Sequence, residues 1–251
     1  MKEAKKVAVA FSGGVDSSLV AKAAVDAGIE TVAITIDSPL FSRREIKNAS
    51  LASEEIGIRQ IVVKSCGLPV ENTPMRCYHC KKNVAKLWKK VGGKRGFHTI
   101  ADGVTVTDIN DRFRPGVDAS SEEKIWHPLV DAGFTKEDVV AVARNVGLSM
   151  WDKPSDACLA SRISYGEAIT LKKLGMVEGA EDFLIGLSKK IRVRIHDSIA
   201  RIEVLPEDFE KIVGMREQII EKFKKIGFTH ITLDLRGYRS GSTNEELNRR
   251  P

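Results

Sequence analysis

The sequence predicts an α/β fold, with a doubly wound parallel sheet in the first part of the chain and a small α+β domain after it. In the first half, short hydrophobic segments alternate with amphipathic ones, which is typical of strands joined by right-handed helical crossovers. After about residue 168 the pattern changes to two alternating strands and a long amphipathic stretch. We therefore expect two domains, at residues 1–168 and 169–251.

Four hydrophobic segments are expected to form the parallel sheet. The second of them is β-branched and uninterrupted, as is common for a strand buried on both faces. The expected strands are residues 6–11, 31–37, 59–64 and 98–101. The expected helices are residues 19–27, 43–56, 77–90 and 137–145, and the expected loops are residues 108–116 and 150–166.

The second domain is expected to hold three strands and one long helix. Residues 192–196 and 200–204 alternate in polarity, which predicts an antiparallel pair of strands. Residues 209–226 have helical spacing and end at a glycine, and residues 230–235 resemble a further strand.

A serine- and glycine-rich loop, Ser-Gly-Gly-Val-Asp-Ser-Ser at residues 12–18, separates the first strand from the first helix. Free N–H groups and the helix dipole make such a position an anion site, and glycine permits a tight turn. The loop is neither a Walker motif nor G-x-G-x-x-G, and it resembles the PP-loop of the ATP pyrophosphatases. That resemblance places Asp16 beside the pyrophosphate group through Mg²⁺; the alternative is a chance match in an ordinary turn. The residues expected to bind ATP here are Ala10, Ser12, Gly13, Gly14, Asp16, Ser17 and Ser18.

Other polar residues follow strands of the same sheet. Because ligands of such sheets lie at the carboxyl ends of the strands, we expect these residues to share one crevice with the loop. Ile36 and Asp37, within residues 34–38, are expected to flank the adenine or ribose. Asp102 and Gly103 are expected near the phosphates.

The chain has four cysteines, and two of them form a C-x-x-C motif, Cys77 and Cys80, at the start of an expected helix. A helix start and neighbouring cations favour thiolates, which bind metals or act as nucleophiles. Cys158 is the expected third member, since three thiolates can hold a [4Fe–4S] cluster with one open iron. A redox disulfide, an incomplete zinc site or a buried structural Cys158 are the alternatives, and Cys66 is expected to be structural.

The formal net charge of +6 suits an anionic partner, either a nucleotide or a nucleic acid. The chain has no apolar run long enough to cross a membrane. Its first six residues lead directly into the first strand, so we expect no signal peptide and a cytoplasmic protein.

Together these motifs resemble the LarE family of ATP-dependent sulfur transferases, within the PP-loop ATP pyrophosphatases. The resemblance covers nearly the whole chain. It rests on residues 12–18, 76–81, 152–162, 192–203 and 237–244. It departs from the family at residues 104–111, where an Asn- and Asp-rich turn is usual.

The resemblance implies that a pyridinium mononucleotide carboxylate is adenylated and that sulfur then displaces AMP, as part of nickel-pincer nucleotide biosynthesis. In one version of the family Cys158 gives up its own sulfur; in the other, favoured here, Cys77, Cys80 and Cys158 hold a [4Fe–4S] cluster that carries sulfide. Arg192 and Arg194 are expected to clamp the substrate phosphate, the alternative being an exposed face of an alternating strand. Arg162 is a comparable residue beside Cys158. Glu203 is expected either to bind metal or to pair with Arg201.

The expected cofactors are thus ATP, Mg²⁺ and the [4Fe–4S] cluster, and the expected partners are a nucleotide substrate, a sulfide donor and further copies of the chain. The main alternative is a tRNA thiolation enzyme, although no appended RNA-binding module is evident. A synthetase such as NAD synthase would leave the three cysteines unexplained. A non-catalytic nucleotide- or metal-binding protein is the remaining alternative.

Overall fold

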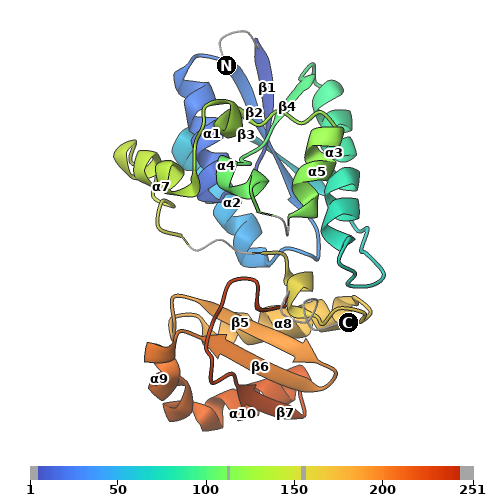
Figure 1. The fold of residues 1–251 in the computed structure, drawn as a ribbon, viewed down its shortest axis with the longest axis vertical. Coiled ribbons are helices and arrows are strands. Elements are labelled where there is room, and N and C mark those ends of the chain that lie inside the picture. Colours follow the sequence, from blue (N-terminus) through green and yellow to red (C-terminus); the bar gives the residue numbers. More distant parts are fainter. Residues whose placement is uncertain (1–4, 112–113, 154–156, 244–251) are drawn as a thin grey trace. The chain divides into compact units, whose positions relative to one another are not determined.

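The computed structural model describes residues 5–111, 114–153 and 157–243 and divides into two compact units (Figure 1). The first unit is formed by Met1–Gly67 with Met75–Ser155, and the second by Leu68–Pro74 with Asp156–Pro251. No helix of the described residues is long and apolar enough to cross a membrane.

The division falls earlier than residue 168 because a short segment of the first half pairs with residues that precede the second sheet. Asn72 donates its backbone N–H to Glu167 O at 2.9 Å, and Ile169 donates to Val70 O at 3.0 Å. The Asn72 side chain also donates to Ile163 O at 2.5 Å. Residues 157–168 are therefore built into the second unit.

The first unit contains a four-stranded sheet in the order β3-β2-β1-β4, and all of its neighbouring strands are parallel. This arrangement confirms the predicted fold class. The strands are β1 (Lys6–Ala10), β2 (Glu30–Asp37), β3 (Arg59–Lys64) and β4 (Thr99–Ala101).

Helices cover both faces of this sheet. Along β1, Val7 and Val9 belong to one hydrophobic cluster, whereas Ala8 and Ala10 belong to another. The first cluster includes residues of α1, α2 and α7, and the second includes Ala85 and Trp88 of α3. The helices are α1 (Val15–Asp26), α2 (Arg43–Ile56), α3 (Arg76–Gly93), α4 (Val106–Ile109), α5 (Pro115–Glu122), α6 (Pro128–Asp131) and α7 (Lys136–Asn145).

The prediction of a loop at residues 108–116 is wrong in part, because α4 and α5 extend into this stretch. Helix α4 begins with a capping box, in which the Thr105 side chain and the Asp108 carboxylate bond each other's backbone N–H groups. Helix α5 begins with Pro115, which suits the first position of a helix. The capping box and Pro115 are local signals of a helix start, whereas the polar composition of the stretch favours a loop.

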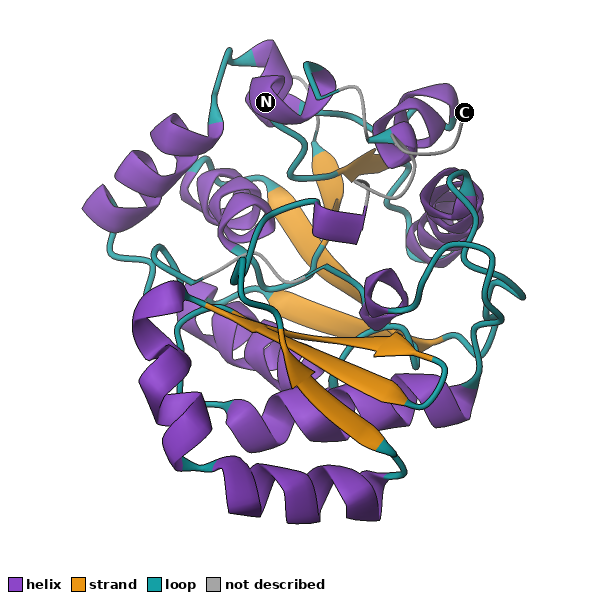
Figure 2. Ribbon diagram, turned by 60° about the horizontal axis from the view of Figure 1, so that its bottom comes forward, coloured by secondary structure: helices purple, strands orange, loops and turns teal. Residues whose placement is uncertain are grey.

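The second unit contains a three-stranded sheet in the order β5-β6-β7, with the helices along one side of it (Figure 2). Strands β5 and β6 are antiparallel, as predicted, and β7 is parallel to β6. Helix α8 packs against β5, and α10 packs against α8. The elements are α8 (Leu171–Leu184), β5 (Ile191–His196), β6 (Ile199–Val204), α9 (Phe209–Gly214), α10 (Arg216–Ile226) and β7 (His230–Leu233), with 3₁₀ turns at Leu159–Arg162 and Pro206–Asp208.

Three expectations for this unit need correction. The helix expected at residues 209–226 is broken at Met215, directly after Gly214, and glycine is a poor helix former. Strand β7 ends at Leu233, because Asp234 begins a turn by accepting the Arg236 N–H at 2.9 Å. Residues 150–166 are not all loop, since they include the 3₁₀ turn at Leu159–Arg162.

Candidate active site

The loop between β1 and α1 is held together by its own serines. Gly14 N–H donates to Ser12 Oγ at 3.3 Å, and Ser17 Oγ donates to Gly14 O at 3.2 Å. The hydroxyls of Ser12 and Ser17 lie 3.2 Å apart. Because Gly14 is the N-cap of α1, the first N–H groups of this helix lie at the carboxyl edge of the sheet, where a phosphate would bind.

At two positions only glycine fits, because the backbone of a neighbouring helix lies where a Cβ atom would be. Gly13 has a φ of +72°, and a Cβ there would lie 2.4 Å from Ala49 Cα of helix α2. A Cβ on Gly103 would lie 2.7 Å from Ser17 N. The structure therefore brings the end of β4 against the first turn of α1, within one unit. By contrast, a Cβ on Gly14 would contact only Ser12 Oγ, at 3.4 Å.

The Asp16 carboxylate is only half satisfied. Its Oδ2 accepts from Lys136 Nζ at 2.6 Å. Its Oδ1 is buried and has no hydrogen-bond partner among the described residues, and the same is true of Ser18 Oγ. Unpaired buried polar atoms in native proteins call for a partner, and a nucleotide with its metal ion would supply one. Lys136 was not identified from the sequence, where it lies 120 residues from Asp16.

The Asp102 carboxylate is buried and bound by protein groups on all sides. It accepts from Lys81 Nζ at 3.0 Å and Ser120 Oγ at 2.8 Å, and it lies 2.7 Å from His127 Nδ1. Burial opposes its ionisation, but the charge of Lys81 and the hydrogen bond from His127 outweigh burial and hold the pKa of Asp102 well below its ordinary value. Asp102 thus positions Gly103, and it is Gly103 that contacts the loop.

The remaining nucleotide residues lie at the ends of β1 and β2. Ala10 and Ile36 are buried, at 8% and 6% exposure. Asp37 accepts from Arg43 NH1 at 2.5 Å, so its carboxylate is paired within the protein. Their contact with adenine or ribose stays a prediction.

The C-x-x-C motif occupies the first turn of α3, in which residues three apart lie on the same side of the helix. Cys77 is exposed and Cys80 is half-buried, and neither forms a disulfide. Arg76 NH2 donates to Cys77 Sγ at 3.1 Å. The same helix carries Lys81, so the cysteine pair and the Asp102 network share one rigid element.

Cys158 lies in the second unit, directly before the 3₁₀ turn at Leu159–Arg162, and is a free, half-buried thiol. Arg162 holds this segment: its NH1 donates to Cys158 O at 3.1 Å and also to Ala157 O. The Nε and NH2 groups of Arg162 donate to the two oxygens of Glu181 at 2.9 and 3.0 Å. Arg162 is 2% exposed, so its guanidinium is engaged in fixing the backbone beside Cys158.

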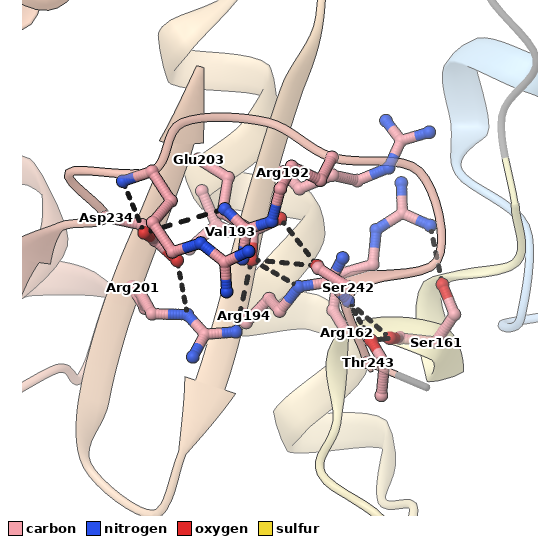
Figure 3. Close-up of polar contacts among 12 residues, drawn as sticks. Ser161, Arg162, Arg192, Val193, Arg194, Arg201, Glu203, Asp234, Ser242 and Thr243 are labelled. Atoms are coloured by element: carbon pink, nitrogen blue, oxygen red, sulfur yellow. Dashed lines mark hydrogen bonds and ion pairs between the residues drawn. The ribbon is translucent and has the colours of Figure 1, made fainter. Parts of the chain in front are cut away.

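A buried charge network spans β5 and β6 (Figure 3). Glu203, which is fully buried, accepts from Arg194 Nε at 2.6 Å, Arg201 NH2 at 3.1 Å and Ser242 Oγ at 3.2 Å. The register pairs Arg194 with Arg201 and Arg192 with Glu203, which places all four side chains on one face of the sheet. Glu203 therefore pairs with Arg194 as well as with Arg201.

The two arginines expected to bind a phosphate differ in their surroundings. Arg194 is tied to Glu203 and donates to Ser161 O at 2.9 Å and to Thr243 Oγ1. The Arg192 guanidinium lies 5.4 Å from the centre of the Tyr238 ring. Both are buried, at 9% and 7% exposure for Arg192 and Arg194, which does not fit the alternative of an exposed strand face. Their phosphate-binding role stays a prediction.

The described residues contain no group of three His, Cys, Asp or Glu side chains that could hold a metal ion. Cys77 and Cys80 belong to the first unit and Cys158 to the second. Residues 154–156 of the Cys158 segment, and Asn244, lie outside the described residues. The [4Fe–4S] ligand set therefore stays a prediction. Cys66, between β3 and α3, is exposed.

Comparison with known proteins identifies the family. Residues 1–67 match the family model described as asparagine synthase. The chain is 37% identical over 253 residues to an uncharacterised protein of Synechocystis sp., covering 98% of this chain and 94% of that protein. It is 35% identical over 257 residues to the pyridinium-3,5-bisthiocarboxylic acid mononucleotide synthase of Lactiplantibacillus plantarum, covering 98% and 92% of the two chains.

A more distant similarity connects the chain to RNA-modifying enzymes. It is 23% identical over 283 residues to the tRNA-specific 2-thiouridylase MnmA of Caulobacter vibrioides, covering 88% of this chain and 73% of that protein. The same family is indicated by the loop at the start of α1, by the parallel sheet and by the match over nearly the whole chain. The chain belongs to the LarE family of PP-loop proteins and is an ATP-dependent sulfur transferase.

Proposed function

We propose that this enzyme adenylates a carboxylate of a pyridinium mononucleotide and replaces one carboxylate oxygen with sulfur. The observation that carries the proposal is the 35% identity, over 98% of the chain, to a pyridinium-3,5-bisthiocarboxylic acid mononucleotide synthase. The phosphate-binding geometry of the loop and the fixed segment around Cys158 support it.

The first half-reaction is the transfer of AMP to the substrate. A substrate carboxylate oxygen attacks the α-phosphorus of ATP, and pyrophosphate leaves. The N–H groups at the start of α1 bind the phosphates, and Gly103 keeps the loop backbone in place. The unpaired Oδ1 of Asp16 fits a role as a Mg²⁺ ligand, since carboxylate oxygens are the donors that this ion prefers. Bound Mg²⁺ would stabilise the charge of the leaving pyrophosphate.

The second half-reaction is acyl substitution. A sulfur nucleophile attacks the carbonyl carbon of the acyl-adenylate, AMP leaves with the electron pair of the broken C–O bond, and a thiocarboxylate forms. Arg162 fixes the backbone at Cys158, and Arg192 and Arg194 are the proposed ligands of the substrate phosphate.

Three cysteines are proposed to carry the sulfur. Cys77, Cys80 and Cys158 form no disulfide, and cysteine sulfur is the donor that an iron–sulfur cluster requires. The position of the pair at the start of α3 suits thiolates. A [4Fe–4S] cluster on these ligands would supply an open iron that presents sulfide. The alternative is a sacrificial Cys158: its thiolate forms a thioester, and β-elimination then leaves dehydroalanine in the protein.

Pyrophosphate release tests the acceptor. We expect release with ATP and a pyridinium mononucleotide carboxylate, together with one AMP per thiocarboxylate formed. A second candidate, tRNA thiolation, has the MnmA similarity in its favour. It would require tRNA to stimulate pyrophosphate release and to bind with a steep salt dependence. Release with tRNA and none with the mononucleotide would overturn the proposal.

A further inference from the structure

We propose that Lys136 is the cation that this loop uses in place of a Walker lysine, and that its ammonium group moves from Asp16 to the polyphosphate of ATP when the nucleotide binds. The proposal rests on the use of ATP by this enzyme and names a residue that the family motifs do not include.

The position of Lys136 is the first observation. It is the first residue of α7, and its backbone N–H donates to Thr107 Oγ1 at 3.1 Å, which fixes the start of the side chain. From there the ammonium group reaches Asp16 Oδ2 at 2.6 Å and Asp108 Oδ2 at 3.3 Å. It thus lies between two carboxylates, a position otherwise suited to a metal ion.

The electrostatics of Asp16 are the second observation. Asp16 lies in the first turn of α1, close to where the N–H groups would bind a polyphosphate. A carboxylate and a polyphosphate repel each other unless cations lie between them. With Lys136 on Oδ2 and no partner for Oδ1 among the described residues, Asp16 can accept Mg²⁺ once the ammonium group leaves.

Asp108 can lose Lys136 without being left unpaired. Its Oδ1 lies 2.7 Å from Arg114 NH1, and its Oδ2 accepts from Thr105 N and Oγ1 at 3.0 and 2.8 Å. Removing the ammonium group would therefore leave Asp108 still compensated, whereas Asp16 would need the incoming metal.

The Lys136 side chain borders open space on the side of α4. The Lys136 side chain is 32% exposed, and it lines a cavity of about 500 Å³ together with Thr107, Asp108, Arg114 and Thr135. A lysine on a flexible four-carbon stem can turn within such a space, and its compact charge is well suited to phosphate.

The proposal predicts opposite changes for two ligands in the Lys136→Met variant. Mg²⁺ alone should bind more tightly, because no ammonium group competes for Asp16. Mg²⁺ with α,β-methylene-ATP should bind about tenfold more weakly or worse, because one charge-assisted contact to the phosphates is lost. Lys136→Arg, which keeps the charge, should restore most of the nucleotide affinity.

Isothermal titration calorimetry of the full chain with each ligand measures the two affinities. The melting temperature of each variant shows whether it is folded. Lys22→Met is the matched control, because Lys22 lies on α1 and pairs with Asp26 at 2.5 Å, away from the loop. It should change neither affinity. Unchanged nucleotide affinity in Lys136→Met, or a loss of both affinities, would overturn the proposal. Failure of the wild-type chain to bind the analogue would instead overturn the ATP-dependent function itself.

Discussion

The guanidinium of Arg162 and the carboxylate of Glu181 are joined by two hydrogen bonds, of 2.9 and 3.0 Å, and their side chains are only 2% and 5% exposed. Glu181 also accepts the backbone N–H of Val193 at 3.0 Å, while Arg162 donates to Cys158 O at 3.1 Å. One buried ion pair therefore connects α8, β5 and the backbone at Cys158. The pair therefore holds the backbone that carries the Cys158 thiol.

Replacing Arg162 by Met should destabilise the second unit and loosen the Cys158 segment. The change leaves Glu181 buried without its cation, and breaking a buried pair in this way costs about 3–5 kcal/mol. Urea unfolding should show the loss. Iodoacetamide labelling, resolved by peptide mass, should show faster alkylation of Cys158.

Cys66 is the internal control for this labelling, since it is exposed in the same chain and belongs to the other unit. Its rate should stay constant. Arg162→Lys should recover part of the stability and part of the protection. If unfolding free energy and the Cys158 rate were both unchanged, Arg162 would not be a positioning residue.

Replacing Gly103 by Ala should weaken ATP binding. The new Cβ would lie 2.7 Å from Ser17 N and 2.8 Å from Asp16 C, and these are backbone atoms that cannot turn aside. Overpacking of this kind costs about 1–3 kcal/mol. Titration with a non-hydrolysable nucleotide measures the effect, and circular dichroism should show an intact fold.

Gly175→Ala provides the comparison, because it lies in α8 and a Cβ there would meet nothing within 4 Å. It should be neutral or should stabilise the chain by up to about 1 kcal/mol, as Ala is the better helix former. Equal nucleotide affinity in Gly103→Ala and wild type would contradict the close contact between the end of β4 and the loop.

The lowered pKa of Asp102 predicts how stability changes with pH. Its pKa is lowered below the ordinary 3.8, so its ionised form stabilises the folded state. This contribution is present above about pH 4 and is lost as the pH falls below that value towards the lowered pKa. Asp102→Asn lacks this contribution. Its unfolding free energy should therefore fall less steeply than that of the wild type between about pH 5 and pH 2, the range in which the carboxyl group becomes protonated.

At neutral pH the Asp102→Asn variant should be less stable than wild type by about 1–3 kcal/mol, because charged hydrogen bonds to Lys81 and His127 are lost. Asp138→Asn is a suitable control for the acid range: its carboxylate is also paired but is exposed, and its lowered pKa arises from Thr135. Parallel pH curves for wild type and Asp102→Asn would show that Asp102 is not held ionised.

Local patterns were enough to predict the front sheet and its loop. The run from Lys6 to Ala10 is apolar on both faces, and the structure places Val9 and Ala8 in different core clusters. The strand, loop and helix around residues 12–18 follow directly along the chain, so their order could be read from the sequence. The antiparallel pair β5 and β6 was predicted for the same reason.

Contacts between distant residues could not be predicted in this way. Lys136 meets Asp16 across 120 residues, and no periodicity or motif connects the two. The alternation of Arg192 and Arg194 left an exposed strand face open as an alternative, because a strand pattern alone does not reveal that Glu203 lies opposite and is buried. The segment Leu68–Pro74 joins the second unit through backbone hydrogen bonds that cannot be predicted from the sequence of the segment.

The most direct test of sulfur delivery is the iron and acid-labile sulfide content of anaerobically purified protein, measured beside Cys77→Ala, Cys80→Ala, Cys158→Ala and, as the control, Cys66→Ala. Three-cysteine ligation predicts about four irons per chain in the wild type and in the Cys66 variant, with loss in each of the other three. Absence of iron after reconstitution, or full iron in the Cys158 variant, would contradict it.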